Sequence, residues 1–375
     1  MYLKKLIFTN FKNCEQAELN FSEKINCFVG NNGAGKTNVL DGIYYLSFCK
    51  SYFNSMDTQN ILHEAPFFAI HGHYSKNGNK DDVTSCIQKR GAKKQFKHNK
   101  KEYERLADHI GLYPLVMVSP YDRDLINDGS EIRRKYIDGV ISQFDRKYLD
   151  HLLNYNKVLA QRNALLKRMG ELRSFDRSQI EIWDNQLINH GEVIYEKRKH
   201  FLDDFSPIFQ KYFEVITKGR EKVSITYDSQ LAENNLGELL IDSFKKDCMM
   251  RFTTQGIHKD DLQFNIGDHP IKKFGSQGQQ KSFVIAIKLA QFEYTKNVKG
   301  FNPVLLLDDI FDKLDEHRVE QLIDLVSKNN FGQVFITDTQ QFRVERLFQK
   351  NKIDHKIFLV KAGVISEIEN NNSKK

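Results

Sequence analysis

The stretch Gly30-Asn31-Asn32-Gly33-Ala34-Gly35-Lys36-Thr37 matches the phosphate-binding pattern G-x-x-x-x-G-K-[ST]. Residues Ile25 to Val29 before it have the apolar character of a short buried strand, and Asn38 to Ser47 after it have the apolar spacing of a helix. The alternative is a glycine-rich turn into a helix, and a chance match of the four constrained positions is expected in about 1 in 100 chains of this length. Because strand, loop and helix occur together, we predict that this stretch binds a nucleoside triphosphate.

The residue types in this stretch suit a triphosphate. Glycines let the backbone wrap a phosphate without Cβ clashes, and the N–H groups and the helix start then attract its oxygens. Lys36 is expected to reach the β- and γ-phosphates, and the Thr37 hydroxyl to ligate Mg²⁺. The predicted ATP contacts are Gly30, Asn31, Asn32, Gly33, Ala34, Gly35, Lys36, Thr37 and Asn38.

The composition indicates a soluble globular protein with two or three lobes. The 375 residues are 40% apolar and 28% charged, and the net charge of +7 favours polyanionic partners without establishing one. Five cysteines without a C-x-x-C pair suit a reduced interior rather than a disulfide framework or a zinc site. No signal peptide is recognisable and no apolar run approaches the roughly 20 residues of a membrane span, so we expect a cytoplasmic protein.

A basic segment, Lys89–Lys101, follows a series of predicted strands. Apolar patterning places those strands at residues 3–8, 17–21, 67–74 and 83–87. Lysines neutralise phosphates and release counterions, so the segment is a candidate DNA contact. The residues proposed for it are Lys93, Lys94 and Lys97. The alternative is a solvated hairpin tip, the commoner meaning of such a charge run.

The middle of the chain has helical patterning. Apolar residues recur at helical spacing over Arg133–Gly170 and more loosely over Gln179–Tyr212, which predicts two long helices packed on each other. Their charged faces, including Arg162, are weak DNA candidates and more commonly just solvated. The expected fold class is α/β, with an ATPase lobe over residues 1–120 and 275–375 and a mainly helical second lobe inserted at 121–274.

The segment Ser276-Gln277-Gly278-Gln279 precedes the apolar residues Phe283 to Leu289. Ser276 and Gln279 have the spacing of a capping box, so one interpretation is simply a well-capped helix. The functional interpretation uses the same groups, because a hydroxyl, a glycine and free N–H groups at a helix start can hold a γ-phosphate.

The apolar run Val304 to Leu307 ends at Asp308-Asp309. Such a run marks a strand buried on both faces, as in a parallel sheet, and ligand chemistry lies at the carboxyl ends of such strands. We predict that Asp308 ligates Mg²⁺ and that Asp309 activates water, against the alternative of a purely structural strand end. Another buried strand is expected at residues 334–336.

Taken together, these motifs resemble the ABC/SMC class of ATPase heads and, within it, the RecF recombination-mediator family. The resemblance extends over nearly the whole chain. Beyond the phosphate loop it rests on Asn10-Phe11-Lys12-Asn13, Ser119-Pro120, Arg133-Arg134, Asp138, Tyr155, Leu159, Gln161-Arg162-Asn163, Gly256, His258, Asp260-Asp261-Leu262, Ser276-Gln277-Gly278-Gln279-Gln280 and Leu306-Leu307-Asp308-Asp309. We interpret His258 as structural.

The resemblance implies an ABC/SMC-like head that dimerises on ATP and binds single- and double-stranded DNA at gaps as a weak, DNA-stimulated ATPase. It implies a role in recombinational repair, replication restart and SOS induction, with RecO and RecR as partners in loading RecA. The implied site consists of catalytic Lys36 and Asp309, metal ligands Thr37 and Asp308, signature residues Ser276, Gln277, Gly278 and Gln279 acting on the partner subunit's ATP, and Asp315 at the dimer seam.

The chain departs from transporter ATPases in its motifs. It has Ser276-Gln277-Gly278 where they show leucine-serine-glycine-glycine, Asp309 where they place glutamate, and Thr337-Asp338-Thr339 where they place histidine. The sensing loop around Ser119-Pro120-Tyr121-Asp122 lacks their glutamine. The main alternative is still the ATP-hydrolysing subunit of a transporter, although that would not need the long helical insert. The other alternative is a clamp in which ATP joins subunits without being hydrolysed.

Overall fold

The computed structural model describes residues 1–76, 80–219, 221–309, 331–341 and 354–368. The chain forms two compact units, Met1–Asp122 with Gln291–Lys375 (unit 1) and Arg123–Ala290 (unit 2). The boundaries proposed from the sequence lie at residues 121 and 275, whereas the second division falls at residues 290 and 291, inside a helix.

Unit 1 contains an antiparallel sheet with the strand order β2-β1-β4-β5-β6-β7. Its strands are β1 (Tyr2–Phe11), β2 (Cys14–Asn20), β4 (Phe67–Lys76), β5 (Lys80–Lys89), β6 (Gln95–His98) and β7 (Lys101–Glu102). The register of β1 against β4 shifts between Leu3 and Lys5, so Leu3 and Leu6 are both buried although three positions separate them. The strands predicted in this region are confirmed.

The second sheet of unit 1 carries the motifs, in the order β15-β14-β3-β13-β12-β8. Its strands are β3 (Ile25–Val29), β8 (Leu115–Val118), β12 (Val304–Leu307), β13 (Val334–Asp338), β14 (His355–Lys361) and β15 (Val364–Ile368). All but the β14–β15 pair are parallel. Every residue of β3, β12 and β13 is buried, which confirms the expectation from their continuous apolar runs.

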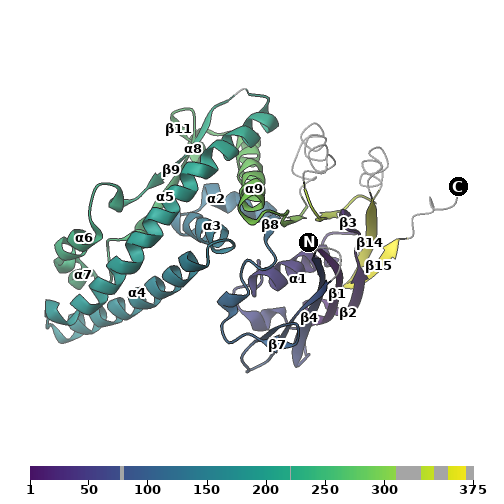
Figure 1. Cartoon of the computed structure of the whole chain (residues 1–375), viewed down its shortest axis with the longest axis horizontal. Coiled ribbons are helices and arrows are strands. Elements are labelled where there is room, and N and C mark those ends of the chain that lie inside the picture. Colours follow the sequence, from purple (N-terminus) through teal and green to yellow (C-terminus); the bar gives the residue numbers. More distant parts are fainter. Residues whose placement is uncertain (77–79, 220, 310–330, 342–353, 369–375) are drawn as a thin grey trace. The chain divides into compact units, whose positions relative to one another are not determined.

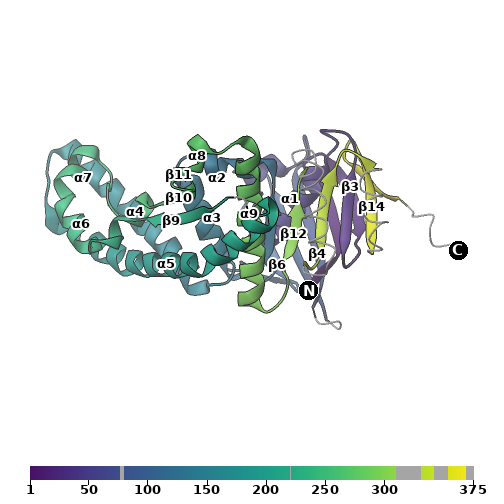
Figure 2. The same ribbon diagram turned by 90° about the horizontal axis from the view of Figure 1, so that it is seen from above.

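Helix α1 (Lys36–Phe48) contacts strands of both sheets of unit 1. Val39, Leu40, Ile43 and Leu46 on this helix are fully buried in one apolar cluster with residues from both sheets. Figure 2 shows β3 and β14 side by side in this unit. Because β3 lies inside the sheet and α1 inside the core, the loop that joins them is held at both ends.

Unit 2 is mainly helical. Its elements are α2 (Asp124–Asn127), α3 (Ser130–Ser142), α4 (Arg146–Leu172), α5 (Glu181–Thr217), α6 (Leu236–Asp242), α7 (Phe244–Met250), α8 (Ile271–Phe274), most of α9 (Gln277–Lys299), and strands β9 (Val223–Asp228), β10 (Asp261–Ile266) and β11 (His269–Pro270). The helices α4 and α5 pack along each other (Figure 1).

The first long helix predicted from the sequence is in fact two helices. The break lies at residues 143–145, where the Asp145 side chain accepts a hydrogen bond from Tyr148 N and caps α4. The apolar spacing continues across the break, so periodicity alone did not reveal it. The second helix begins at this point because the Asp145 side chain caps it.

Buried arginines tie the helices of unit 2 together. Arg162 is fully buried and pairs with Asp184 at 2.6 Å and Asp247 at 2.7 Å. Arg198 pairs with Asp138 at 2.8 Å and with a second buried carboxylate. Assigning Arg162 to a charged helix face was therefore wrong, because its guanidinium joins α4 to α5 and α7 inside the unit.

Candidate nucleotide site

The phosphate loop connects β3 to α1 in unit 1. Gly33 and Gly35 have φ of 77° and 112°, in the left-handed region that favours glycine. Gly35 is the N-cap of α1 and provides no side-chain acceptor for the first N–H groups of the helix. An anion is the natural partner for such groups, so the backbone fits a phosphate.

Lys36 is almost completely buried at this loop. Its ammonium donates hydrogen bonds to the carbonyl oxygens of Gly30 at 2.9 Å and Asn31 at 3.1 Å. The positive charge is thus held within the loop itself.

The hydroxyl of Thr37 meets the carboxylate that ends β12. Thr37 Oγ1 donates to Asp308 Oδ1 at 2.9 Å, although the two residues are 271 positions apart. Burial raises the pKa of the Asp308 carboxyl to about 6, and neighbouring Asp309 acts in the same direction while hydrogen bonds from Thr337 and Thr37 oppose it. The positive charge of Lys36 also opposes the rise, but burial outweighs it, and a bound divalent cation would stabilise the ionised carboxylate further.

Thr37 and Asp308 fit Mg²⁺ better than a metal ion that takes all of its ligands from the protein. Across the described parts of the chain, no three His, Cys, Asp or Glu side chains gather into a metal-binding group. Mg²⁺ usually takes one or two protein ligands, several waters and substrate phosphates. Thr37 and Asp308 provide such a pair directly beside the phosphate loop.

Thr337, at the end of β13, is a site residue that sequence reasoning did not assign. Its hydroxyl lies 2.8 Å from Asp308 Oδ1 and accepts a hydrogen bond from Asp309 N at 2.8 Å. Asp309 has a φ of 43°, which a non-glycine residue adopts only when its surroundings hold it. Thr337 therefore fixes the carboxylate of Asp308 and the backbone of Asp309. The sequence did indicate a buried strand ending at Thr337-Asp338-Thr339. It did not indicate which strand would lie beside it.

The predicted signature segment lies in unit 2 and forms the capping box expected from its spacing. Gln279 N donates to Ser276 Oγ at 3.2 Å, and Ser276 N donates to Gln279 Oε1 at 2.6 Å. Gln279 Nε2 also donates to Glu221 at 2.6 Å. Ser276 and Gln277 are exposed at this helix start. Asp315 lies outside the described residues.

Comparison with known proteins identifies the family. Residues 2–363 match the RecF/RecN/SMC N terminal domain. The DNA replication and repair protein RecF of Phocaeicola vulgatus is 50% identical over 368 residues, or 98% of each chain. The chain belongs to the RecF family. The RecF of Flavobacterium johnsoniae is 51% identical over 358 residues, covering 96% of this chain and 99% of that protein.

Solved structures agree with the RecF assignment. The recombination mediator protein RecF-ATP in the RecFOR pathway superposes with a TM-score of 0.88 at 28% identity over 98% of each chain. An Smc head domain from Pyrococcus furiosus has a TM-score of 0.58 at 17% identity, covering 98% of this chain and 96% of that one, and shares the fold. The predicted ABC/SMC-like ATPase head is confirmed, and membership of the RecF family decides against a transporter subunit. None of the described helices combines the length and apolarity needed to cross a bilayer.

In the basic segment of this RecF-family chain, Lys94 has a different role from the one predicted. Lys94 was predicted to contact DNA, but its ammonium lies 2.7 Å from Asp57 Oδ2 and 3.1 Å from the Tyr45 hydroxyl. Its side chain is only 10% exposed. Lys94 therefore braces the interior of unit 1, because an ion pair there satisfies a half-buried carboxylate. Lys93 is exposed and Lys97 partly exposed, so both remain candidates.

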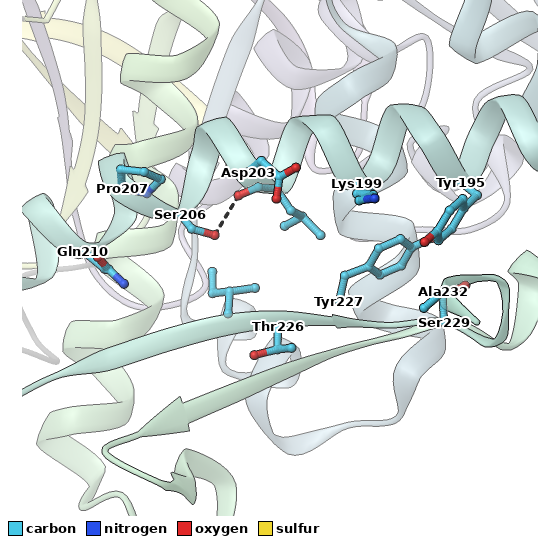
Figure 3. A pocket seen from close by; sticks show the side chains of 12 residues that line it. Tyr195, Lys199, Asp203, Ser206, Pro207, Gln210, Thr226, Tyr227, Ser229 and Ala232 are labelled. Carbon is cyan, nitrogen blue, oxygen red and sulfur yellow. Dashed lines mark hydrogen bonds between the residues drawn. The ribbon is translucent and has the colours of Figure 1, made fainter.

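A pocket of about 500 Å³ lies in unit 2, between α5 and β9 (Figure 3). The rings of Tyr195 and Tyr227 stack at one end with centroids 5.7 Å apart, and Ser206 Oγ donates to the Leu202 carbonyl at 2.7 Å. Its lining mixes aliphatic, aromatic, hydroxyl, amide and charged groups and includes none of the predicted site residues. The pocket therefore holds none of the groups assigned to the nucleotide chemistry of this RecF-family chain.

Proposed function

We propose that this protein is an ATP-dependent, DNA-binding ATPase of recombinational repair. The proposal rests on one observation: Thr37 of the phosphate loop bonds the Asp308 carboxylate, and Thr337 holds both Asp308 and Asp309. A purely structural strand end would not need hydroxyl hydrogen bonds from both Thr37 and Thr337 to converge on the Asp308 carboxylate.

Each side chain of the site would have a separate role in hydrolysis. Lys36 and the loop N–H groups would hold the phosphates, and Thr37 and Asp308 would hold Mg²⁺, which when bound offsets the charge on the phosphate oxygens. Asp309 would accept the proton of the attacking water as general base. An aspartate is one methylene shorter than the glutamate of transporters, so we expect slow turnover.

The remaining proposals rest on the family. ATP would join two heads, with Ser276 and Gly278 facing the partner subunit's γ-phosphate. The dimer would bind DNA at single-strand gaps, be stimulated by it, and assist RecO and RecR in loading RecA in the cytoplasm. A neighbouring structure is described as part of the RecFOR pathway, which supports this assignment.

The test compares nucleotide binding with phosphate release, each with and without gapped DNA. We expect Lys36→Ala to weaken ATP binding by roughly 10- to 100-fold and to abolish hydrolysis, since charge-assisted hydrogen bonds are worth about 1.5–3 kcal/mol. Asp309→Asn should bind ATP normally while hydrolysis falls at least about 100-fold, as expected for loss of a general base. Lys245→Ala, at an exposed lysine of unit 2 outside the basic segment, is the control.

Two results would oppose the proposal. If Asp309→Asn hydrolyses ATP like the wild type, Asp309 is not the base. If the wild type binds ATP and dimerises without releasing phosphate, the protein is the non-hydrolysing clamp.

A further inference from the structure

The turn of the C-terminal hairpin lies against the phosphate loop. Ala362 and Gly363, between β14 and β15, have φ of 48° and 84°. Gly363 N donates a hydrogen bond to the carbonyl of Ala34 at 2.9 Å. Since β14 pairs in parallel with β3, its final turn rises at the edge of the sheet from which the phosphate loop starts.

A second turn, between β1 and β2, reaches the same carbonyl. Asn13 Nδ2 donates to Ala34 O at 3.1 Å, and Asn13 Oδ1 accepts from Asn38 Nδ2 at 2.7 Å. The Ala34 carbonyl thus receives donors from turns that are about 350 positions apart in the chain, and Asn13 also ties the loop to the first turn of α1.

The packing between these pieces leaves no space for side chains. A Cβ on Gly363 would lie 2.0 Å from the Asn13 carbonyl oxygen, and one on Gly35 would lie 2.7 Å from the Asn13 side-chain amide. A Cβ on Gly30 would lie 2.3 Å from the Val360 carbonyl oxygen. The phosphate loop is therefore interlocked with both turns.

Because the peptide bond is planar, the contacts with the Ala34 carbonyl also fix the direction of the Gly35 N–H group. In a trans peptide the carbonyl oxygen and the next N–H point in opposite directions. Holding Ala34 O on the outer side of the loop turns Gly35 N–H toward the inner side, where a phosphate would bind. We propose that Asn13 and Gly363 are positioning residues for phosphate binding, acting through the Ala34 carbonyl. This inference rests on the proposed nucleotide function and makes the C-terminal hairpin part of the nucleotide site.

The experiment compares Gly363→Ala with Gly300→Ala. Both glycines have positive φ, of 84° and 74°, but nothing lies within 4 Å of a Cβ at Gly300. The control therefore carries the backbone strain without the contact. Asn13→Ala is the second variant, and because Asn13 is exposed its loss does not open the core. We measure the melting temperature and amide exchange of residues 30–36 without nucleotide, and then ADP affinity.

We expect Gly363→Ala and Asn13→Ala to bind ADP about tenfold more weakly than Gly300→Ala, the effect of losing one well-oriented hydrogen bond. Their loop amides should exchange faster in the nucleotide-free protein, while Asn13→Ala melts like the wild type. Unchanged ADP affinity and loop exchange in Asn13→Ala would overturn the positioning role. A wild type that binds no ADP would overturn both this inference and the proposed nucleotide function.

Discussion

At the scale of single residues, His258 shows how surroundings fix a protonation state. Its Nε2 lies 3.1 Å from the Thr253 carbonyl, to which it must donate, and its Nδ1 therefore accepts from the Tyr155 hydroxyl at 2.9 Å. Burial is the main cause that lowers the pKa of His258 to about 4. The histidine is neutral and satisfied within unit 2, in agreement with a structural role.

This environment predicts acid sensitivity of unit 2. The unfolded chain takes up a proton near the ordinary histidine pKa of about 6.5 while folded His258 resists it to about 4, so stability falls as the pH falls between these values. At about pH 5 the loss attributable to His258 should be about 1–2 kcal/mol, and His258→Gln should remove it. Urea unfolding followed by the fluorescence of Trp183, the single tryptophan of the chain and a residue of unit 2, measures the effect.

The control is His200→Gln on α5, whose side chain is 77% exposed. It should leave the pH dependence as in the wild type. Equal acid sensitivity in wild type and His258→Gln would show that His258 is not the group responsible.

At the scale of elements, the start of α9 is a capped helix start for which we also propose a phosphate-binding role. The reciprocal bonds of the capping box satisfy the N–H groups of Ser276 and Gln279, and Glu221 fixes the Gln279 side chain. The same exposed helix start is where we propose that the partner subunit's γ-phosphate binds. Capping explains Ser276 and Gln279, but it does not require that Ser276 be exposed beside Gly278.

Substitution of Ser276 separates these uses. Ser276→Arg places a long side chain where the γ-phosphate should dock, so the variant should bind ATP through the intact phosphate loop but neither dimerise nor hydrolyse it. Ser276→Thr keeps the capping hydroxyl and should behave like the wild type. Light scattering with and without ATP, beside a nucleotide titration, decides. Normal ATP-dependent dimers of Ser276→Arg would leave Ser276 as a helix cap only.

At the scale of the whole molecule, the net charge of +7 is consistent with binding a polyanion, but charge alone does not locate the surface. The exposed part of the basic segment is narrower than its sequence suggests, because Lys94 is paired inside unit 1. A DNA test should therefore alter Lys93 and Lys97 and leave Lys94 intact.

We expect the double variant Lys93→Glu, Lys97→Glu to weaken duplex binding and to reduce the log–log salt slope by about 0.9 for each DNA phosphate that the variant no longer neutralises. The matched control is Lys245→Glu, Lys246→Glu, which makes the same charge change at exposed positions of unit 2. Affinity is measured at several salt concentrations by fluorescence anisotropy. An unchanged slope in the first variant would exclude the β6 region as a DNA-binding surface. Equal losses of affinity in both variants would show that the net charge, and not a contact at β6, causes the loss.

The sequence by itself determined those features that depend on neighbouring positions in the chain. The phosphate loop, the buried strand ending at Asp308 and the cap of α9 were all predicted, because glycine spacing, apolar periodicity and a serine–glutamine pair act over about ten residues or fewer. The family resemblance, which rests on these same motifs, is confirmed as well.

Only the tertiary structure decided which of these local pieces meet. The approach of Thr337 to Asp308 depends on β13 pairing with β12, and the contacts of Asn13 and Gly363 with Ala34 depend on two turns converging at the phosphate loop. The burial of Lys94 depends in the same way on Asp57, which is distant in the sequence but adjacent in the fold. Strand order and long-range pairing arise from the packing of whole sheets around α1, so no local pattern in the sequence records them.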